Sequence, residues 1–256
     1  MSEPAAPAAP ARPRKPRYVA SVKSVTPLTP RMVRVTFTGD GLADFGWNGP
    51  AAHIKLIFGS ADQEPRPPTR TYTPRRFDAT SGELDVDFVL HGEGPASAWA
   101  SQAAVGQQLT IAGPGRSYTV EPGAQWFLLA GDDTAIPALC TIIESVPVSI
   151  PVRALIEVVD DQEQHDLHAG DNVTVEWLYR GPNVADSGRA LEAAVRAAQL
   201  PPGTGRVYVA CESDAMRRIR RHLLQERKLD RSQLVTRGYW HLGVVDHPDR
   251  DYGEDV

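Results

Sequence analysis

The sequence predicts two domains, an N-terminal antiparallel β-barrel followed by an α/β domain built on a parallel sheet. In the first half, short segments of alternating hydrophobicity are separated by Pro- and Gly-rich turns, which is typical of a small barrel. In the second half, continuous apolar runs alternate with helical patterns, as expected when strands are buried on both faces. The pattern changes near residues 118–125, so we expect domains over 18–122 and 123–243.

Each half predicts its elements in order. In the barrel, the alternating segments place strands over residues 18–25, 32–37, 51–58, 84–91 and 109–112. In the α/β domain, apolar runs place strands over 126–130, 152–159, 173–178, 206–211 and 234–240. Helices are expected over 134–145 and 187–198, and a third begins at Ser213, whose hydroxyl suits an N-cap.

Composition narrows the range of function classes. The chain has 256 residues, 41% apolar and 23% charged, as in an ordinary globular protein. Its net charge of −5 argues against nucleic-acid binding. No apolar stretch approaches the roughly 20 residues that a membrane-spanning helix needs. Cys140 and Cys211 lie in apolar stretches and are predicted to be small buried hydrophobic residues.

The two ends of the chain are expected to be tails. Residues 1–17 are rich in Pro, Ala and Arg and lack the apolar core of a signal peptide, so we expect disorder there and a cytoplasmic protein. Residues 244–256 are expected to form an acidic tail. Because no apolar stripe is left over, the expected state is a monomer.

A short extended segment, Arg70-Thr71-Tyr72-Thr73, points to a ligand. Alternation places Arg70 and Tyr72 on one side of the strand, and Thr71 and Thr73 on the other. A guanidinium, an aromatic ring and hydroxyl groups together suit a large ligand with a flat ring and a phosphate.

The segment that follows supplies an anion site. After the strand ending at His91, Gly94 is placed to be an N-cap and Pro95 the first helical residue, with free N–H groups through Ala96 and Ser97. Together with Arg70 and Tyr72, this turn predicts a flavin dinucleotide held on the barrel. His91 is either a hydrogen-bond donor to the flavin or its phosphates, or a structural histidine.

Two strand ends in the second half have two interpretations each. Asp132, Thr134 and Ala135 follow the first buried strand, where they either receive a phosphate or nicotinamide or simply start a capped helix. Glu212 follows a later strand, where it either contacts a ribose hydroxyl or is a solvated charge at a helix start. No complete Gly-x-Gly-x-x-Gly motif accompanies them. Arg217 and Arg218 lie near the second helix start and are candidates for holding a 2′-phosphate.

Isolated basic residues stand elsewhere in the barrel. Lys55 lies in a strand and Arg116 follows a Gly-Pro-Gly turn; each is either a ligand-facing cation on the open side of the flavin or an ordinary surface charge. No Gly-x-Ser-x-Gly elbow, Walker A motif or clustered set of metal ligands is present, so we expect no catalytic nucleophile and no resident metal.

Taken together, these motifs resemble the siderophore-interacting, FAD-dependent ferric reductases, a branch of the ferredoxin–NADP reductase-like superfamily. The resemblance covers residues 18–243. It rests on Ala52-His53-Ile54-Lys55-Leu56, Arg70-Thr71-Tyr72-Thr73, Asp87-Phe88-Val89-Leu90-His91, Gly94-Pro95-Ala96-Ser97-Ala98-Trp99, Ala130-Gly131-Asp132-Asp133-Thr134-Ala135-Ile136-Pro137-Ala138 and Gly238-Tyr239-Trp240.

The resemblance implies roles for these residues. Tyr72 would lie against the isoalloxazine with Thr73 beside it, Arg70 on the pyrophosphate, and the segment from Val89 through Leu90 and His91 to Ser97 around the FAD. Asp132, Thr134 and Ala135 would enter the nicotinamide domain, and Trp240 would lie near the flavin. Lys55 and Arg116 would attract the anionic ferric siderophore. A third basic residue often follows Gly-Tyr-Trp in the family; His241 stands there.

The implied activity is transfer of electrons from NADH or NADPH, or from a reduced ferredoxin, through FAD to a ferric siderophore, with release of iron(II). Two alternatives stay open from the sequence. One is a general NAD(P)H:flavin or electron-carrier reductase without siderophore specificity. The other is a ferric-siderophore binding protein without enzymatic activity.

Overall fold

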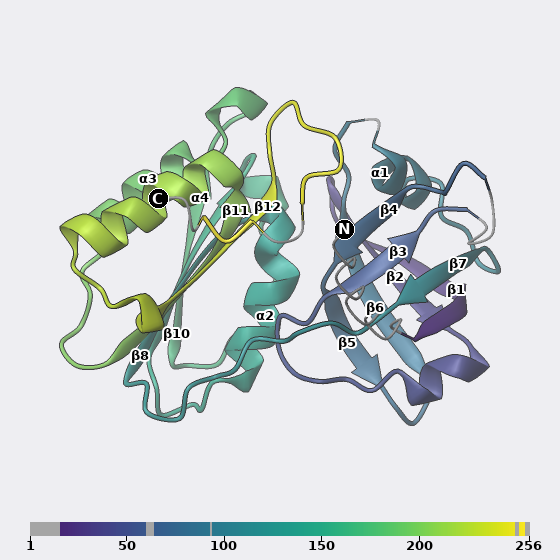
Figure 1. The fold of residues 1–256 in the computed structure, drawn as a ribbon, viewed down its shortest axis with the longest axis horizontal. Helices are drawn as coiled ribbons and strands as arrows, with labels where there is room; N and C mark the ends of the chain where they lie inside the picture. The colour runs from purple at the N-terminus through teal and green to yellow at the C-terminus, as the bar shows by residue number, and fades with distance from the viewer. Residues whose placement is uncertain (1–15, 60–63, 93, 249–250, 254–256) are drawn as a thin grey trace, which may run out of the picture.

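The computed structural model describes residues 16–59, 64–92, 94–248 and 251–253. Most of the expected N-terminal tail, Glu93 of the predicted anion-binding turn and the last residues of the expected C-terminal tail lie outside this range. The described chain forms two domains side by side, an antiparallel sheet and a parallel sheet with helices on both faces (Figure 1). The predicted fold class is confirmed.

The first domain is a seven-stranded antiparallel sheet in the order β4-β3-β7-β1-β2-β6-β5. β4 and β5 lie at opposite ends of this order, yet only Thr73 separates them in the chain. The sheet must therefore curl until its two edges meet, although no ladder pairs β4 with β5 in the described residues. The strands are β1 (Arg17–Thr29), β2 (Met32–Thr38), β3 (Ile54–Ile57), β4 (Thr69–Tyr72), β5 (Pro74–Asp78), β6 (Glu83–Val89) and β7 (Gln108–Ala112).

The barrel core follows the predicted alternation. Leu84, Val86 and Phe88 of β6 are fully buried, and Val35 and Phe37 of β2 pack beside them. β6 stops at Val89, two residues before the expected end, because the chain turns away toward α1 (Pro95–Ala100). β5 was not predicted, since a proline and two arginines interrupt its alternation. A short 3₁₀ helix, η1 (Asp40–Asp44), follows β2.

The second domain is a parallel sheet in the order β10-β9-β8-β11-β12. The chain winds outward through β9 and β10 and then returns to the other side of β8, so a topological switch point lies between β8 and β11. In such sheets, ligands bind outside the carboxyl ends of the strands at this point. The strands are β8 (Trp126–Asp132), β9 (Val152–Val158), β10 (Val173–Tyr179), β11 (Gly205–Glu212) and β12 (Leu234–Trp240).

Helices cover both faces of the parallel sheet, which explains its continuous apolar strands. Phe127 and Leu129 belong to the core beneath α2, whereas Leu128 and Ala130 face the core beneath α3 and α4. The free thiols of Cys140 and Cys211 are buried in these cores, as predicted. The helices are α2 (Ile136–Ser145), α3 (Arg189–Ala197) and α4 (Ser213–Arg221), with short turns η2 (Asp133–Ala135), η3 (Asp161–Glu163), η4 (Val184–Asp186), η5 (His222–Glu226) and η6 (Arg231–Gln233).

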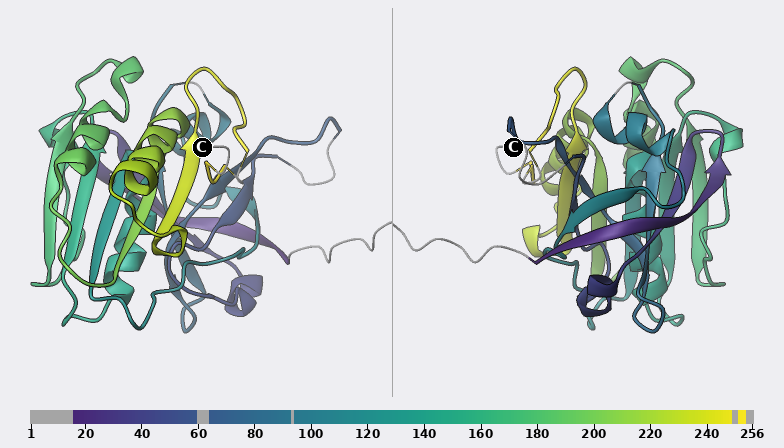
Figure 2. Two further views of the ribbon diagram at one scale, coloured as in Figure 1. Left: turned by 60° about the vertical axis from the view of Figure 1, so that its left-hand side comes forward. Right: turned by 90° about the vertical axis from the view of Figure 1, so that its right-hand side faces the viewer.

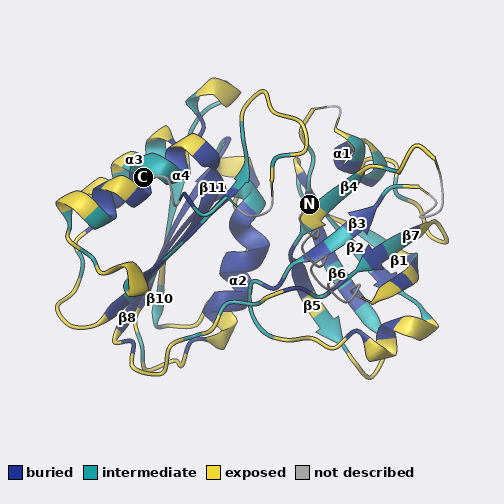
Figure 3. Cartoon of the chain, in the orientation of Figure 1, coloured by how far each residue is buried: buried dark blue, intermediate teal, exposed yellow. Residues whose placement is uncertain are grey.

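Helix α2 joins the two domains. It lies between the two sheets and is buried along most of its length (Figure 3). Arg75 of β5 donates two hydrogen bonds, of 2.6 and 3.1 Å, to the carboxylate of Glu144. Near the middle of the helix, Thr141 accepts a hydrogen bond of 2.9 Å from the backbone N–H of Ala51. Polar contacts from two barrel segments thus fix the position of the second domain.

The segment after β12 loops past the barrel and returns to the parallel-sheet domain (Figure 2). Asp251 accepts hydrogen bonds from Ser213 and Arg217, and its carbonyl accepts one from Gly238. Within the described part of the expected acidic tail, His247 and residues 251–253 therefore contact α4 and β12, whereas 244–246 are exposed. No helix among the described residues is long and apolar enough to cross a bilayer.

Candidate functional site

The predicted ligand segment lies on β4, at the edge of the barrel that faces the second domain. In the ladder with β3, Tyr72 pairs with Ile54, Thr71 with Lys55 and Arg70 with Leu56. Arg70 and Tyr72 thus share the face of the apolar residues Leu56 and Ile54, and the predicted alternation is confirmed. The Tyr72 ring lies 4.6 Å from the ring of Phe88, and burial raises the pKa of its hydroxyl, which stays neutral.

The guanidinium of Arg70 bridges the barrel and the segment after β12. Its Nη1 donates to the carbonyl of Thr69 at 2.9 Å and to Oδ1 of Asp246 at 3.2 Å. The Asp246 side chain is 73% exposed, so this pair is screened by water and contributes less than about 1 kcal/mol. The pair is therefore weak enough for a bound anion to displace Asp246.

A chain of hydroxyl groups joins the barrel edge to the parallel sheet. Burial raises the pKa of the Tyr239 hydroxyl, and neighbouring Tyr208 and Thr73 partly offset this shift; the hydroxyls of Tyr239 and Tyr208 lie 3.1 Å apart. Tyr208 in turn packs edge-on against Tyr118 of the domain linker. The residue that links β4 to β5 thus lies near Tyr239 of β12, which contacts Tyr208 of β11.

The predicted turn after β6 forms as expected. Gly94 is the N-cap of α1 in an extended conformation, and Pro95 is the first helical residue. The backbone N–H of His91 donates to the Ser97 hydroxyl at 3.0 Å, which holds the turn closed. Burial lowers the pKa of His91, and the Asp132 carboxylate partly opposes this shift.

The carboxyl ends of the parallel strands meet at one edge of the second sheet, which we call the carboxyl edge. Asp132 lies buried at the centre of this edge. Its Oδ1 accepts hydrogen bonds from the N–H and the hydroxyl of Thr134, and its Oδ2 accepts from the N–H of Glu212 and from Trp240 Nε1. These four donors use the acceptor capacity of a carboxylate. Asp132 therefore ties together the ends of β8, β11 and β12 and orients the indole of Trp240. Its neighbour Ala135 is fully buried.

Asp133, the next residue, is unusual in its ionisation. Burial and the neighbouring Asp132 raise the pKa of its carboxyl group to about 7. Arg180 opposes this shift from 3.7 Å away. The carboxyl edge therefore carries a group that changes charge near neutral pH.

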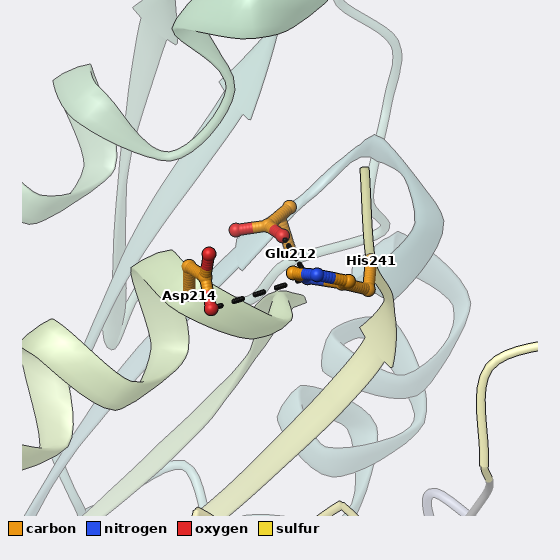
Figure 4. Close-up of side chains that lie close together, drawn as sticks. All are labelled: Glu212, Asp214 and His241. Atoms are coloured by element: carbon orange, nitrogen blue, oxygen red, sulfur yellow. Dashed lines mark hydrogen bonds and ion pairs between the residues drawn. The ribbon is translucent and has the colours of Figure 1, made fainter. Parts of the chain in front are cut away.

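Glu212, Asp214 and His241 form a second cluster at the same edge (Figure 4). His241 Nδ1 lies 3.0 Å from Oε1 of Glu212 and 3.9 Å from Oδ1 of Asp214. The other Glu212 oxygen accepts a hydrogen bond of 3.0 Å from Ala215 N–H and caps α4. The sequence left Glu212 as either a ribose ligand or a solvated charge at a helix start. In the structure it does lie at a helix start, but its side chain is buried and contacts His241.

The predicted substrate cations lie on the barrel. Lys55 lies between the buried residues Ile54 and Leu56 and points away from the core, where its ammonium donates to Thr71 Oγ1 at 2.7 Å. Arg116 is exposed, and its carbonyl contacts His53 Nδ1 at 3.2 Å. Lys55 pairs with Ala112, four residues before Arg116, so both residues lie near one end of β3 and β7. His241, by contrast, lies between two carboxylates of the other domain.

Family comparisons cover both domains. Residues 124–243 match the model for the siderophore-interacting protein, and residues 21–65 and 59–118 match the model for the siderophore-interacting FAD-binding domain.

The chain belongs to the siderophore-interacting protein family. Its relatives within the family include the ferric vibriobactin reductase ViuB of Vibrio cholerae, 32% identical over 231 residues, 83% of this chain and 84% of the relative. The NADPH-dependent ferric-chelate reductase of Escherichia coli is 30% identical over 81% of this chain and 86% of its own. A siderophore utilization protein from T. fusca has the same fold, with a TM-score of 0.84, 33% identity and coverage of 91% and 96%.

Several site residues of this siderophore-interacting protein escaped sequence reasoning. Tyr208 and Arg180 act through contacts between strands, and no short motif marks them; Tyr239 stood in the Gly238-Tyr239-Trp240 motif, but no role was assigned to it. Ser187 is buried at the start of α3 without a hydrogen-bond partner in the described chain. Its only signal was its place as the first residue of a predicted helix, which it shares with many ordinary serines.

Proposed function

We propose that the protein is an FAD-dependent reductase that passes electrons from NAD(P)H to ferric siderophores and releases iron(II). The observation that carries the proposal is the position of Thr73 next to the Tyr239 hydroxyl of β12. The segment Arg70-Thr71-Tyr72-Thr73, which is predicted to bind the flavin, therefore lies against the carboxyl edge of the parallel sheet. Nucleotides bind at this edge in sheets of this kind. Relatives named as ferric vibriobactin and ferric-chelate reductases support this assignment.

The residues present fit FAD. Arg70 offers a guanidinium whose present partner, Asp246, is weakly held and solvent-exposed, and a pyrophosphate is a stronger bidentate partner. Tyr72 offers a neutral aromatic surface beside it. A Cβ added at Gly92 or Gly94 would meet no atom within 4 Å, so the turn after β6 has open space beside it. These residues, with His91, would hold the cofactor.

When bound, FAD supplies the conversion between the two-electron chemistry of a nicotinamide and the one-electron chemistry of iron. The side chains of the protein position the cofactor site and the two domains around it. Asp132 holds the Trp240 indole in place at the carboxyl edge, and the Arg75–Glu144 pair holds the two domains together. No side chain is required as an acid or base, which agrees with the carboxylate of Asp132 being fully engaged by protein donors.

The ferric siderophore is the proposed substrate. Lys55 and Arg116 place two positive charges at one end of the barrel, in a protein whose net charge is −5. Such a local patch raises the encounter rate with an anionic ligand. Reduction to iron(II) weakens its binding to hard oxygen ligands, so the metal is released. We leave His241 out of this patch because it lies between the carboxylates of Glu212 and Asp214 in the other domain.

We also propose a location, an oligomeric state and an electron donor for the protein. The protein acts as a cytoplasmic monomer, and NAD(P)H is its direct donor. A reduced ferredoxin is the alternative donor. It would be favoured if a bound flavin were reduced by ferredoxin and by neither nucleotide.

The flavin part is tested with Arg70→Ala combined with Tyr72→Ala. We expect flavin content after purification to fall and the dissociation constant of FAD to rise by at least tenfold. Arg76→Ala, an exposed arginine on the neighbouring strand β5, is the matched control and should leave both unchanged. Unchanged flavin binding in the double variant would refute the assigned site.

The substrate part is tested with Lys55→Ala combined with Arg116→Ala. We expect the KM for an anionic ferric siderophore to rise about tenfold while flavin content is kept, with a smaller effect at high salt. Lys228→Ala combined with Arg231→Ala, in the other domain, is the control. If siderophores do not accelerate NAD(P)H oxidation in the parent protein, the general flavin reductase is the better description. A protein that binds the siderophore but takes up no FAD would support the binding-protein alternative.

A further inference from the structure

A polar cleft of about 420 Å³ opens at the carboxyl edge of β11, between η4 with the start of α3 and the start of α4. This volume lies within the range of small-molecule sites. The polar side chains that line it are Ser187, Arg189, Glu192, Glu212, Asp214 and Arg218. Both its position and its size suit one end of a nucleotide that reaches the switch point of the sheet.

Ser187, one of the lining residues, has a buried hydroxyl without a partner in the described chain. The residue is 8% exposed. An unsatisfied buried hydroxyl costs about 1–3 kcal/mol. A polar group of a bound molecule would remove that cost.

The charge of the cleft argues against a phosphate. Arg189 pairs with Asp186 at 3.1 Å, and Arg218 donates to Glu192 at 2.6 Å, so each lining arginine already has a carboxylate. Among the lining residues, the three carboxylates of Glu192, Glu212 and Asp214 outnumber the two guanidinium groups. Arg217, the other candidate phosphate ligand, is bound to Asp214 and Asp251.

The helix starts beside the cleft are also occupied. Glu157 accepts hydrogen bonds from the N–H groups of Gly188 and Leu191 at the start of α3, at 2.5 and 2.9 Å. Glu212 accepts from Ala215 at the start of α4. These N–H groups are the ones that hold phosphates at other helix starts. Here carboxylates of the protein have taken them.

Carboxylates suit a different ligand group, the vicinal diol of an unmodified ribose, whose two O–H groups need acceptors. Asp214 is the acceptor best placed to serve, because its side chain is 59% exposed and its ion pair with Arg217, at 3.5 Å, is weak in water. Both oxygens of Glu212 are already engaged, by His241 and Ala215.

We propose that this cleft binds the adenosine ribose of NADH, through Asp214 and Ser187, and that the protein selects NADH over NADPH. The inference rests on the proposed function, because it names the donor of that reaction. A 2′-phosphate would bring a further negative charge of about two toward Asp214, Glu212 and Glu192.

Calorimetric titration of the FAD-loaded protein with ADP-ribose and with 2′-phospho-ADP-ribose tests the selection without turnover. We expect ADP-ribose to bind at least tenfold more tightly. Asp214→Asn should reduce that preference at least threefold, and Ser187→Ala should weaken ADP-ribose binding. Asp171→Asn, an exposed carboxylate before β10, should change neither. Flavin content of each variant verifies that it is folded.

Equal or tighter binding of the 2′-phospho compound would overturn the inference, and so would an unchanged preference in Asp214→Asn. A separate measurement keeps the proposed function distinct. Protein reduced with dithionite and freed of excess reductant is mixed with a ferric siderophore, and iron(II) is trapped. Iron(II) formation supports the reductase whatever the nucleotide result, whereas its absence counts against the reductase itself.

Discussion

The indole Nε1 of Trp240 donates a 2.8 Å hydrogen bond to Oδ2 of Asp132, 108 positions earlier in the chain. The bond spans the carboxyl edge from β12 to β8, across the switch point where the sheet binds ligands. The same oxygen accepts the N–H of Glu212 at the end of β11. One buried carboxylate thus sets the relative positions of three strand ends and of the aromatic residue beside the proposed flavin.

Asp132→Asn should destabilise the protein by about 1–3 kcal/mol. An amide offers one acceptor oxygen in place of two, so some of the four donors around residue 132 must lose their partner. Urea denaturation measures the loss, and the indole N–H resonance of Trp240, assigned with Trp240→Phe, should shift. Asp171→Asn is the matched exposed control. Parent-like stability in Asp132→Asn would mean that the four hydrogen bonds contribute little.

Asp133 predicts a pH-dependent stability. Its pKa is about 7 in the folded protein and near 3.8 in the unfolded chain, so the folded state binds more protons between these values. The contribution of this group to stability therefore falls as pH rises from about 4 to about 7. The stability of Asp133→Asn minus that of the parent should increase over the same range, by at most about 1.4 kcal/mol per pH unit. A difference that is flat in urea titrations from pH 5 to pH 8 would contradict this ionisation.

Removing either partner of the Arg75–Glu144 pair between the domains should destabilise the protein by different amounts. The Arg75 side chain is 7% exposed and that of Glu144 is 40% exposed. Glu144→Ala leaves a buried guanidinium without its partner and should cost about 3 kcal/mol, whereas Arg75→Met leaves a carboxylate that reaches water and should cost less. Glu176→Ala, which removes the half-exposed partner of Arg153, should cost under about 1 kcal/mol. Equal losses for Glu144→Ala and Arg75→Met would show that burial does not govern the pair.

Gly131 precedes the Asp132 centre and should not tolerate a side chain. A Cβ there would lie 2.6 Å from the Cβ of Ala135 and 2.9 Å from the carbonyl oxygen of Ala210. Gly131→Ala should therefore destabilise the protein by about 1–3 kcal/mol. Gly123→Ala is the control, since an added Cβ at that position meets nothing within 4 Å. Thermal unfolding of the two variants compares them directly; similar midpoints would show that the strand end relaxes freely.

The sequence predicted the fold class, because both domains obey simple periodicities. Alternation marked Leu84, Val86 and Phe88 as one face, and the continuous run from Trp126 marked a strand covered on both sides. β5 escaped because Pro74 and Arg75 interrupt its pattern, and Arg75 is buried only through its pairing with α2. Periodicity reports which face a residue occupies, but it carries no information about a partner from a distant element.

The same limit applies to the site. Motifs located Arg70, Tyr72 and the Gly94 turn, because local chain geometry determines those positions. The engagement of Asp132 by four donors, the pairing of His241 with Glu212 and the unsatisfied hydroxyl of Ser187 depend on strands that meet only in the folded sheet. These contacts determine whether a charged side chain can bind a ligand or is already bound to another group of the protein.

An anaerobic absorbance measurement tests the central claim most directly. FAD-loaded protein is mixed with NADH or NADPH, then with a ferric siderophore and an iron(II) trap. We expect the nucleotide to bleach the flavin absorbance band. The ferric siderophore should then restore the band while trapped iron(II) appears. A nucleotide-reduced flavin that stays bleached in the presence of the ferric siderophore, with no iron(II) formed, would contradict this claim.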